Sequence, residues 1–267
     1  SGMDYAINEM GESRSQDPAA RDNIIHLHDR FLPSKHPIVV DIGSGLGGWT
    51  RVMTFLGYKV FSIDKDQRHL DFQKRNFCNI EKNTFLDDLL SLDNYDYSNL
   101  KDDCKEIIKN ASFIRWDFEN YSIQHQLPSQ PWNMVIVDNV FQFMNDFELI
   151  RSLDLIADKI SKNGVVYLNY THWDEKSAPS NYNDNYKFLI KYMKKLGFKI
   201  LEQNHRTYKD KPEHNQLCSH FKDMNDDERL KLLGLSVNLN QMDGEQANKI
   251  NHICSGNILT SALLLSK

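Results

Sequence analysis

The sequence has little of what marks a secreted, membrane-spanning or nucleic-acid-binding protein. Its 267 residues contain 7 prolines and 12 glycines, too few for a collagen-like or low-complexity chain. No stretch approaches the roughly 18 to 20 consecutive apolar residues of a membrane span, and the N-terminus lacks a basic-then-apolar export signal. The net charge of −5 does not supply the positive field of a general nucleic-acid binder. We therefore expect no membrane and no nucleic-acid partner.

Cysteine is also scarce, and its spacing is uninformative. The four cysteines are Cys78, Cys104, Cys218 and Cys254, and no two of them form a CxxC pair. This usage is typical of reduced thiols, so we expect a cytoplasmic protein without a disulfide framework. The histidines and the cysteine within 205–220 lack a recognised ligand spacing, and no metal site is predicted.

The sequence does contain a regular alternation of two kinds of segment. Short β-branched runs predict strands, and segments with apolar residues three and four apart predict helices. The expected strands are 38–42, 59–63, 113–116, 134–137, 165–168, 197–201 and 258–265. The expected helices between them are 49–56, 67–76, 146–160 and 186–196. This order predicts an α/β fold with a mostly parallel sheet and helices on both faces.

Three further segments do not belong to this alternation. Residues 1–36 contain a helix start at Asp17-Pro18 and are expected to form an N-terminal helical cap. The stretches at about 78–110 and 205–256 are longer than routine connections in such a sheet. We interpret them as insertions in one domain that spans 37–267.

A glycine cluster follows the first strand. The segment VDIGSGLGG, residues 40–48, lies between a strand and a helix, where missing β-carbons let the backbone turn sharply and approach a ligand. Gly43, Gly45 and Gly48 also satisfy the GxGxxG pattern of nicotinamide and flavin enzymes. The cluster alone therefore leaves the ligand open.

Four aspartates narrow the range of ligands that this edge could bind. Asp41 precedes the glycines, and Asp64, Asp117 and Asp138 follow the second, third and fourth strands, so the carboxylates converge on one sheet edge. They would repel phosphates. A sulfonium, an ammonium, a ribose diol and an exocyclic amine would each find an acceptor there. These groups together describe S-adenosyl-L-methionine.

From about Pro37 to Tyr170 the sequence resembles the class I S-adenosylmethionine-dependent methyltransferases. The landmarks are VDIGSGLGG, FSIDKD, IRWDF, VIVDNVFQFM and KNGVVYLNY, in the family's order. The resemblance implies a Rossmann-like seven-stranded sheet of order 3-2-1-4-5-7-6. It also implies that the seventh strand, at 258–265, is antiparallel.

The resemblance also implies a cofactor site, residue by residue. Asp41, Gly43, Ser44, Gly45 and Gly47 would form the loop along the methionine and ribose. Asp64, followed by Lys65, would accept the ribose hydroxyls. Asp117 and Phe118 would meet the adenine, and the Asp138-Asn139 backbone would meet the ammonium.

Catalysis leaves a weaker signal in the sequence. Methyl transfer is an in-line displacement from an activated sulfonium, so orientation and water exclusion provide most of the rate. A base is needed only for a protonated acceptor, and His172, after the fifth strand, is the candidate. Aromatic residues around it would form either an acceptor wall or ordinary core packing: Tyr167, Tyr170, Trp173, Tyr182 and Tyr186.

The sequence thus predicts a methyltransferase whose acceptor is a small molecule. Three alternatives stay open: a protein or peptide methyltransferase, a non-catalytic module that binds the cofactor and a partner, and a nicotinamide oxidoreductase. The last predicts NAD affinity that depends on Asp64.

Overall fold

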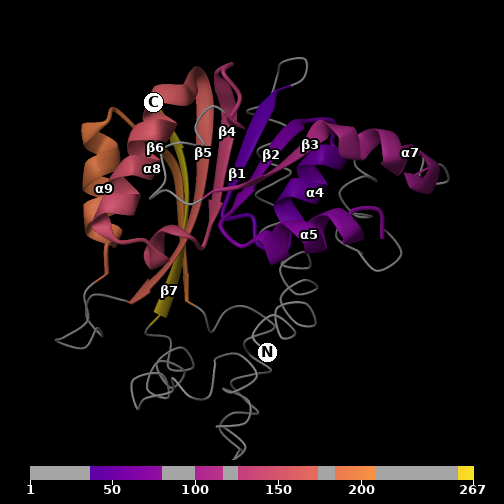
Figure 1. Ribbon diagram of the computed structural model, residues 1–267. Helices are drawn as coiled ribbons and strands as arrows, with labels where there is room; N and C mark the ends of the chain where they lie inside the picture. The colour runs from indigo at the N-terminus through magenta and orange to yellow at the C-terminus, as the bar shows by residue number, and fades with distance from the viewer. Residues whose placement is uncertain (1–36, 80–99, 117–125, 174–183, 208–257) are drawn as a thin grey trace, which may run out of the picture.

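The computed structural model describes residues 37–79, 100–116, 126–173, 184–207 and 258–267, which form an α/β structure around one sheet (Figure 1). The predicted N-terminal cap, residues 1–36, lies outside the described residues, and so do 80–99 of the first predicted insertion and 208–256 of the second.

The elements follow the predicted alternation. In chain order they are β1 (Ile38–Ile42), α4 (Gly48–Phe55), β2 (Lys59–Asp64), α5 (Gln67–Asn76), α7 (Leu100–Ile107), η3 (Ile108–Asn110), β3 (Ala111–Arg115), β4 (Trp132–Asp138), η5 (Phe141–Phe143), α8 (Asp146–Lys159), β5 (Ile160–Trp173), α9 (Tyr186–Lys195), β6 (Lys199–Thr207) and β7 (Ile258–Ser266).

The sheet has the predicted topology. Its strand order is β3-β2-β1-β4-β5-β7-β6. All pairs from β3 to β5 are parallel, and β7 runs antiparallel to both β5 and β6. The order reverses between β1 and β4, and in open α/β sheets ligands bind outside the carboxyl ends of the strands at such a switch point.

β1 lies at the centre of the sheet because its sequence suits burial on both faces. All five residues of IVVDI are buried, and β1 pairs with β2 on one side and β4 on the other. Four of the five are β-branched or apolar, as expected for a parallel strand covered by helices.

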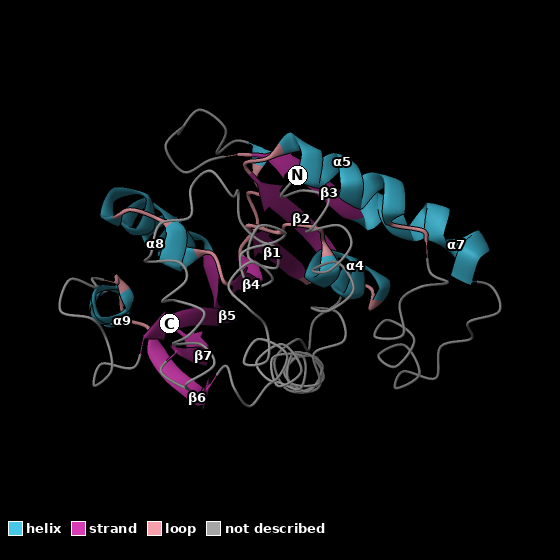
Figure 2. Cartoon of the chain, turned by 90° about the horizontal axis from the view of Figure 1, so that it is seen from below, coloured by secondary structure: helices cyan, strands magenta, loops and turns pink. Residues whose placement is uncertain are grey.

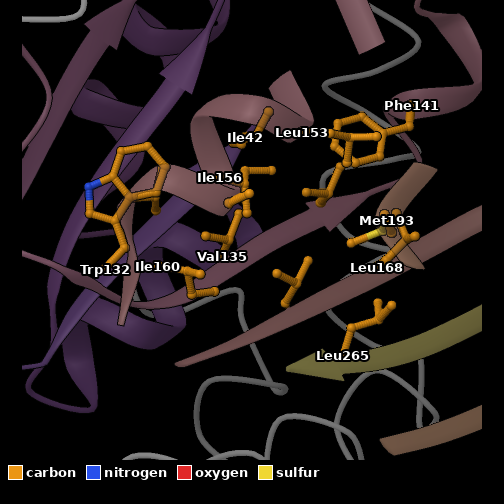
Figure 3. Packing of buried hydrophobic residues seen from close by; sticks show 14 of the residues in the cluster. Ile42, Trp132, Val135, Phe141, Leu153, Ile156, Ile160, Leu168, Met193 and Leu265 are labelled. Atoms are coloured by element: carbon orange, nitrogen blue, oxygen red, sulfur yellow. The ribbon is translucent and has the colours of Figure 1, made fainter. Parts of the chain in front are cut away.

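Helices cover the sheet on two faces (Figure 2). One hydrophobic cluster joins β1, β4 and β5 to α8 and α9, and Leu153, Ile156 and Met193 are fully buried in it (Figure 3). A second cluster joins the opposite face to α4, Phe77 and Cys104. The sheet, with the carboxyl ends of β1 and β2 at one edge, thus lies between two packed layers.

Several strands differ from their predicted bounds, and β6, for example, spans Lys199–Thr207 rather than 197–201. β3 begins at Ala111 and ends at Arg115, so the buried Trp116 follows the strand. β5 extends to Trp173, well beyond the predicted 165–168, because antiparallel β7 pairs with it along 165–173, past the end of β4. Long-range pairing of this kind leaves no local pattern in the sequence.

The expectation of reduced cysteines is wrong for two of them. Cys78, just after α5, forms a disulfide with Cys104 of α7, and their Cα atoms lie 5.7 Å apart. Because β2 and β3 are neighbours, the helices α5 and α7 between them return to the same face of the sheet. The two cysteines are 26 residues apart in sequence, and no local pattern indicates that they lie close together. The cysteines therefore no longer indicate a reducing compartment.

The described part of the chain contains no helix that is both long and apolar enough to cross a membrane.

The α8 face of the core predicts a stability effect. Leu153 is fully buried, so Leu153→Ala should lower the free energy of unfolding by about 2 to 5 kcal/mol through lost burial and the cavity left behind. Urea denaturation measures the change. Asp158→Ala, at an exposed position of the same helix, should stay within about 0.5 kcal/mol of the wild type. Equal effects would contradict this packing.

Candidate functional site

The glycine loop, residues 43–47, connects β1 to α4 at the carboxyl edge of the sheet. Gly43, Gly45 and Gly47 have φ values of +65°, +57° and +85°, a region that other residues rarely adopt. A Cβ atom on Gly43 would lie 2.4 Å from Val140 Cγ2, and one on Gly47 would lie 2.5 Å from Gln73 Cγ. The loop therefore needs glycine for backbone conformation and for close packing.

Asp64 ends β2 beside this loop and is 7% exposed. Its Oδ2 accepts a hydrogen bond from the Gly45 N–H (2.8 Å), and its Oδ1 accepts one from the Asp66 N–H (2.8 Å). Since each carboxylate oxygen can accept two hydrogen bonds, Oδ2 keeps capacity for a ligand hydroxyl. The structure thus brings Asp64 and the glycine loop, both predicted for the cofactor site, into direct contact.

His69 is a neighbour that the sequence analysis missed. Its Nδ1 lies 3.2 Å from Asp64 Oδ1, and this hydrogen bond raises the pKa of the half-buried imidazole. The available signal was its position one turn after the Asp66 N-cap of α5.

Gln73 of α5 was also missed. The side chain is 4% exposed, and its Nε2 donates to Ser44 Oγ (2.9 Å) and to the Gly45 carbonyl (2.7 Å). Its Oε1 accepts from Ser62 Oγ (2.8 Å) on β2. The signal in the sequence was a polar residue on the buried stripe of a helix, between Leu70 and Phe77.

Asp41 is enclosed within the sheet. It is 2% exposed and accepts a hydrogen bond from Thr50 Oγ1 (2.8 Å). Burial raises its pKa to about 7, and the nearby charges of Asp138 and Asp64 act in the same direction. The electrostatic coupling of these three aspartates agrees with the predicted convergence of carboxylates on one edge.

Asp138 ends β4 with its carboxylate held by neutral donors. Oδ2 accepts from Trp49 Nε1 (2.8 Å), and Oδ1 accepts from Asn169 Nδ2 (2.8 Å). Asn139 has φ +56°, and its N–H donates to the Asn169 carbonyl (2.8 Å). Trp49 and Asn169, which the sequence analysis did not assign to the site, thus fix the turn after β4.

The other predicted cofactor residues are less informative. Asp117 and Phe118 lie outside the described residues. Lys65 is exposed, and its carbonyl accepts from Arg115 Nε (3.3 Å). Among the described residues predicted to meet the cofactor, Lys65 alone is exposed.

His172, the candidate base, lies in a polar cluster on β5 and β7. It is 8% exposed, its Nε2 lies 2.7 Å from Ser261 Oγ, and its ring stacks on Tyr186 at 4.1 Å between centroids. Ser261 Oγ in turn lies 2.5 Å from His205 Nδ1. The structure therefore shows a buried, hydrogen-bonded histidine.

The predicted aromatic group around His172 is divided by the sheet. Tyr170 and Tyr186 pack together and belong to the α8 and α9 face. Tyr167 points to the other face and contacts Trp49. Side chains alternate along a strand, so neighbours in sequence face opposite layers. Tyr182 lies outside the described residues, as does the side chain of Trp173.

The buried Asp41 predicts a pH-dependent stability. An unfolded carboxyl titrates near 3.8 and the folded one near 7, so the folded state binds the extra proton between these values and loses stability as pH rises through them. Asp41→Asn removes this loss. In urea denaturation without ligand, its advantage over the wild type should be nearly absent at pH 4 and grow to at most about 4 kcal/mol at pH 8. An advantage independent of pH would contradict the raised pKa.

The glycine loop predicts contrasting effects of one methyl group. Gly43→Ala should lower the free energy of unfolding by about 1 to 3 kcal/mol, because the new Cβ meets Val140 and φ is positive. Gly48→Ala is the matched control, since no atom lies within 4 Å of its Cβ position. Thermal unfolding compares the two, and similar losses would show that the loop does not constrain Gly43.

Comparison with known proteins supports the fold described above. No family model and no curated protein matches the sequence. Solved structures do match. A putative sarcosine dimethylglycine methyltransferase from Galdieria sulphuraria has 9% identity and a TM-score of 0.62, with 92% of this chain and 83% of that chain covered.

Two further structures extend the comparison. Phosphoethanolamine N-methyltransferase 2 of Haemonchus contortus, solved with phosphomonomethylethanolamine and S-adenosylhomocysteine, has 17% identity and a TM-score of 0.55. The alignment covers 92% of this chain but 52% of that one, so this chain spans about half its length. The cyclopropane synthase MmaA2 of Mycobacterium tuberculosis has 11% identity and a TM-score of 0.58, with 93% and 84% covered. Together with the strand order, these likenesses show that the chain has the class I methyltransferase fold.

Proposed function

We propose that the protein is an S-adenosyl-L-methionine-dependent methyltransferase that acts on a small-molecule acceptor. The observation that carries the proposal is the hydrogen bond from the Gly45 N–H to Asp64 Oδ2 at the carboxyl edge of β1 and β2. It joins a glycine turn to a carboxylate with one acceptor position left, which is the chemistry that a ribose hydroxyl requires.

The charges around the glycine loop favour this cofactor over a dinucleotide. Asp64 ends β2 and Asp138 ends β4, the strands on either side of β1, and Asp41 of β1 interacts electrostatically with both. A pyrophosphate here would be repelled, whereas the sulfonium and the ammonium of the proposed cofactor would be attracted. The residues present therefore fit the group.

Each side chain has a separate task in this proposal. Asp64 would hold the ribose, the 43–47 backbone would lie along the methionine part, and the turn at Asp138-Asn139 would receive the ammonium. When bound, the cofactor supplies an electrophilic methyl group on a sulfonium. The protein's contribution is then orientation, since in-line displacement requires the acceptor atom opposite the sulfur.

His172 stays the candidate base for an acceptor that must lose a proton. Its Nε2 lies 2.7 Å from Ser261 Oγ, and this contact orients the ring. Tyr186 stacks on the ring and fixes its plane. An acceptor that is already deprotonated would need neither group.

The small-molecule acceptor is supported by the three structural neighbours. One is named as a phosphoethanolamine methyltransferase, one as a putative sarcosine dimethylglycine methyltransferase and one as a cyclopropane synthase. Protein or peptide acceptors are the alternative, and acceptor screening should include both classes.

Calorimetric titration with S-adenosylhomocysteine tests the proposal without an acceptor, with NAD as the competing ligand. The wild type should bind S-adenosylhomocysteine with a micromolar dissociation constant and should not bind NAD. Asp64→Ala and Gly45→Val should each weaken binding by about 100-fold or more, because they remove the ribose acceptor and the loop conformation. Asp71→Ala, on the exposed side of α5, should bind as the wild type does.

Circular dichroism of each variant confirms that folding is retained. Binding of NAD alone would contradict the proposal and favour the oxidoreductase alternative. Unchanged affinity in both site variants would contradict the site assignment.

A further inference from the structure

Helix α5 contacts the candidate cofactor site at each successive turn. Asp66 caps the helix and donates its N–H to Asp64, and His69 lies against the same carboxylate. Gln73, one turn later, reaches the glycine loop. The helix thus carries three residues that hold either Asp64 or the loop that Asp64 binds.

Gln73 is placed to fix the backbone of the loop. The Gln73 side-chain amide donates to the Gly45 carbonyl (2.7 Å), while the Gly45 N–H donates to Asp64 Oδ2. Its aliphatic part fills the space that a side chain on Gly47 would need. Gln73 therefore contacts two of the three positive-φ glycines of the loop, Gly45 and Gly47.

The end of α5 is anchored by several contacts at one place. Phe77 packs between Phe55 of α4 and Phe113 of β3. Cys78 forms the disulfide with Cys104 of α7. Arg51 of α4, the helix that begins at the glycine loop, donates from Nη2 to the Asn79 carbonyl (2.5 Å). Both helices that follow the strands of the site therefore meet at the disulfide.

We propose that Gln73 is a positioning residue for the cofactor-binding loop, and that the Cys78–Cys104 disulfide makes this positioning sensitive to thiol redox state. The disulfide lies five residues, or a little more than one helical turn, beyond Gln73. By linking the end of α5 to α7, the disulfide keeps Gln73 where its side-chain amide can donate to the Gly45 carbonyl. The inference rests on the proposed function, because it concerns the affinity of that site.

The redox step is a simple exchange. A dithiol reductant breaks the sulfur–sulfur bond, supplies two electrons and two protons, and leaves two cysteine thiols while it becomes a cyclic disulfide. Cys78 is exposed and Cys104 is buried, so attack occurs from the Cys78 side. After reduction the end of α5 keeps Phe77 and Arg51 as anchors but loses its covalent link to α7.

Variants of Gln73 test the positioning role. Gln73→Met keeps the volume beside Gly47 and removes the hydrogen bonds, and it should weaken S-adenosylhomocysteine binding by about tenfold. Gln73→Glu should bind weakly at pH 8, where a carboxylate faces the Gly45 carbonyl. It should recover toward the wild type at pH 5.5, where a protonated carboxyl can donate again. Affinities are compared with the wild type at each pH.

In protein that thermal unfolding shows to be folded at both pH values, a merely structural role for Gln73 would not produce this pH recovery. Asp71→Ala, on the exposed face of the same helix, is the control and should match the wild type at both pH values. Wild-type affinity in Gln73→Met, or an unchanged ratio for Gln73→Glu across pH, would overturn the positioning role.

Reduction tests the disulfide. In calorimetry, dithiothreitol should weaken S-adenosylhomocysteine binding by the wild type about fivefold. Cys78→Ser should bind as weakly as the dithiothreitol-treated wild type, with or without reductant. Its lack of response to dithiothreitol would exclude effects through Cys218 and Cys254. Thermal unfolding checks that Cys78→Ser is folded at the titration temperature. Equal affinities with and without reductant would overturn the redox part.

The two proposals fail in different ways. Oxidised wild type that does not bind S-adenosylhomocysteine would overturn the proposed function and this inference together. Binding that is lost in Asp64→Ala but is unaffected by the Gln73 and redox tests would leave the proposed function intact and overturn only this inference.

Discussion

The hydrogen bond between the Gly45 N–H and Asp64 Oδ2 is the contact on which the candidate site depends. It ties the loop after β1 to the end of β2, two strands that are parallel neighbours in the sheet. Because it uses only one acceptor position of the oxygen, the same contact that shapes the loop leaves a place for a ligand. Removing either partner would alter both shape and recognition.

The rest of the fold supports that contact. The central strand β1 is buried on both faces and places the loop at the point where strand order reverses. Asp138 reaches the same edge from β4, with Trp49 and Asn169 holding its carboxylate. The low-dielectric surroundings strengthen each of these charge interactions, as the raised pKa of Asp41 indicates. The edge is therefore a preorganised cluster of hydrogen-bond acceptors.

Much of the architecture could be predicted from sequence because it depends on local patterns. The β-branched run at 38–42, the glycines that follow it and the Asp66 cap each have a local physical cause. The full strand order came from the family resemblance. The length of β5 could not be predicted, since it depends on a partner strand almost a hundred residues away.

The candidate site divides in the same way. Asp64, Asp138 and the loop glycines lie next to strands and could be found by position. Gln73, His69 and the Cys78–Cys104 disulfide depend on how α5 packs over the sheet, which spacing alone does not give. His172 was found by its place after a strand, but its burial against Ser261 and Tyr186 arises from β7 and α9. Gln73, a polar residue on the buried face of a predicted helix, was the clearest sequence feature pointing to a further site residue.

A crystal structure of the complex with S-adenosylhomocysteine tests the central claim most directly. The account predicts ribose hydroxyls within hydrogen-bond distance of Asp64 Oδ2, with the amino-acid part along residues 43–47 and its ammonium near Asp138. A ligand bound elsewhere, or one whose ribose lies away from Asp64, would contradict the account.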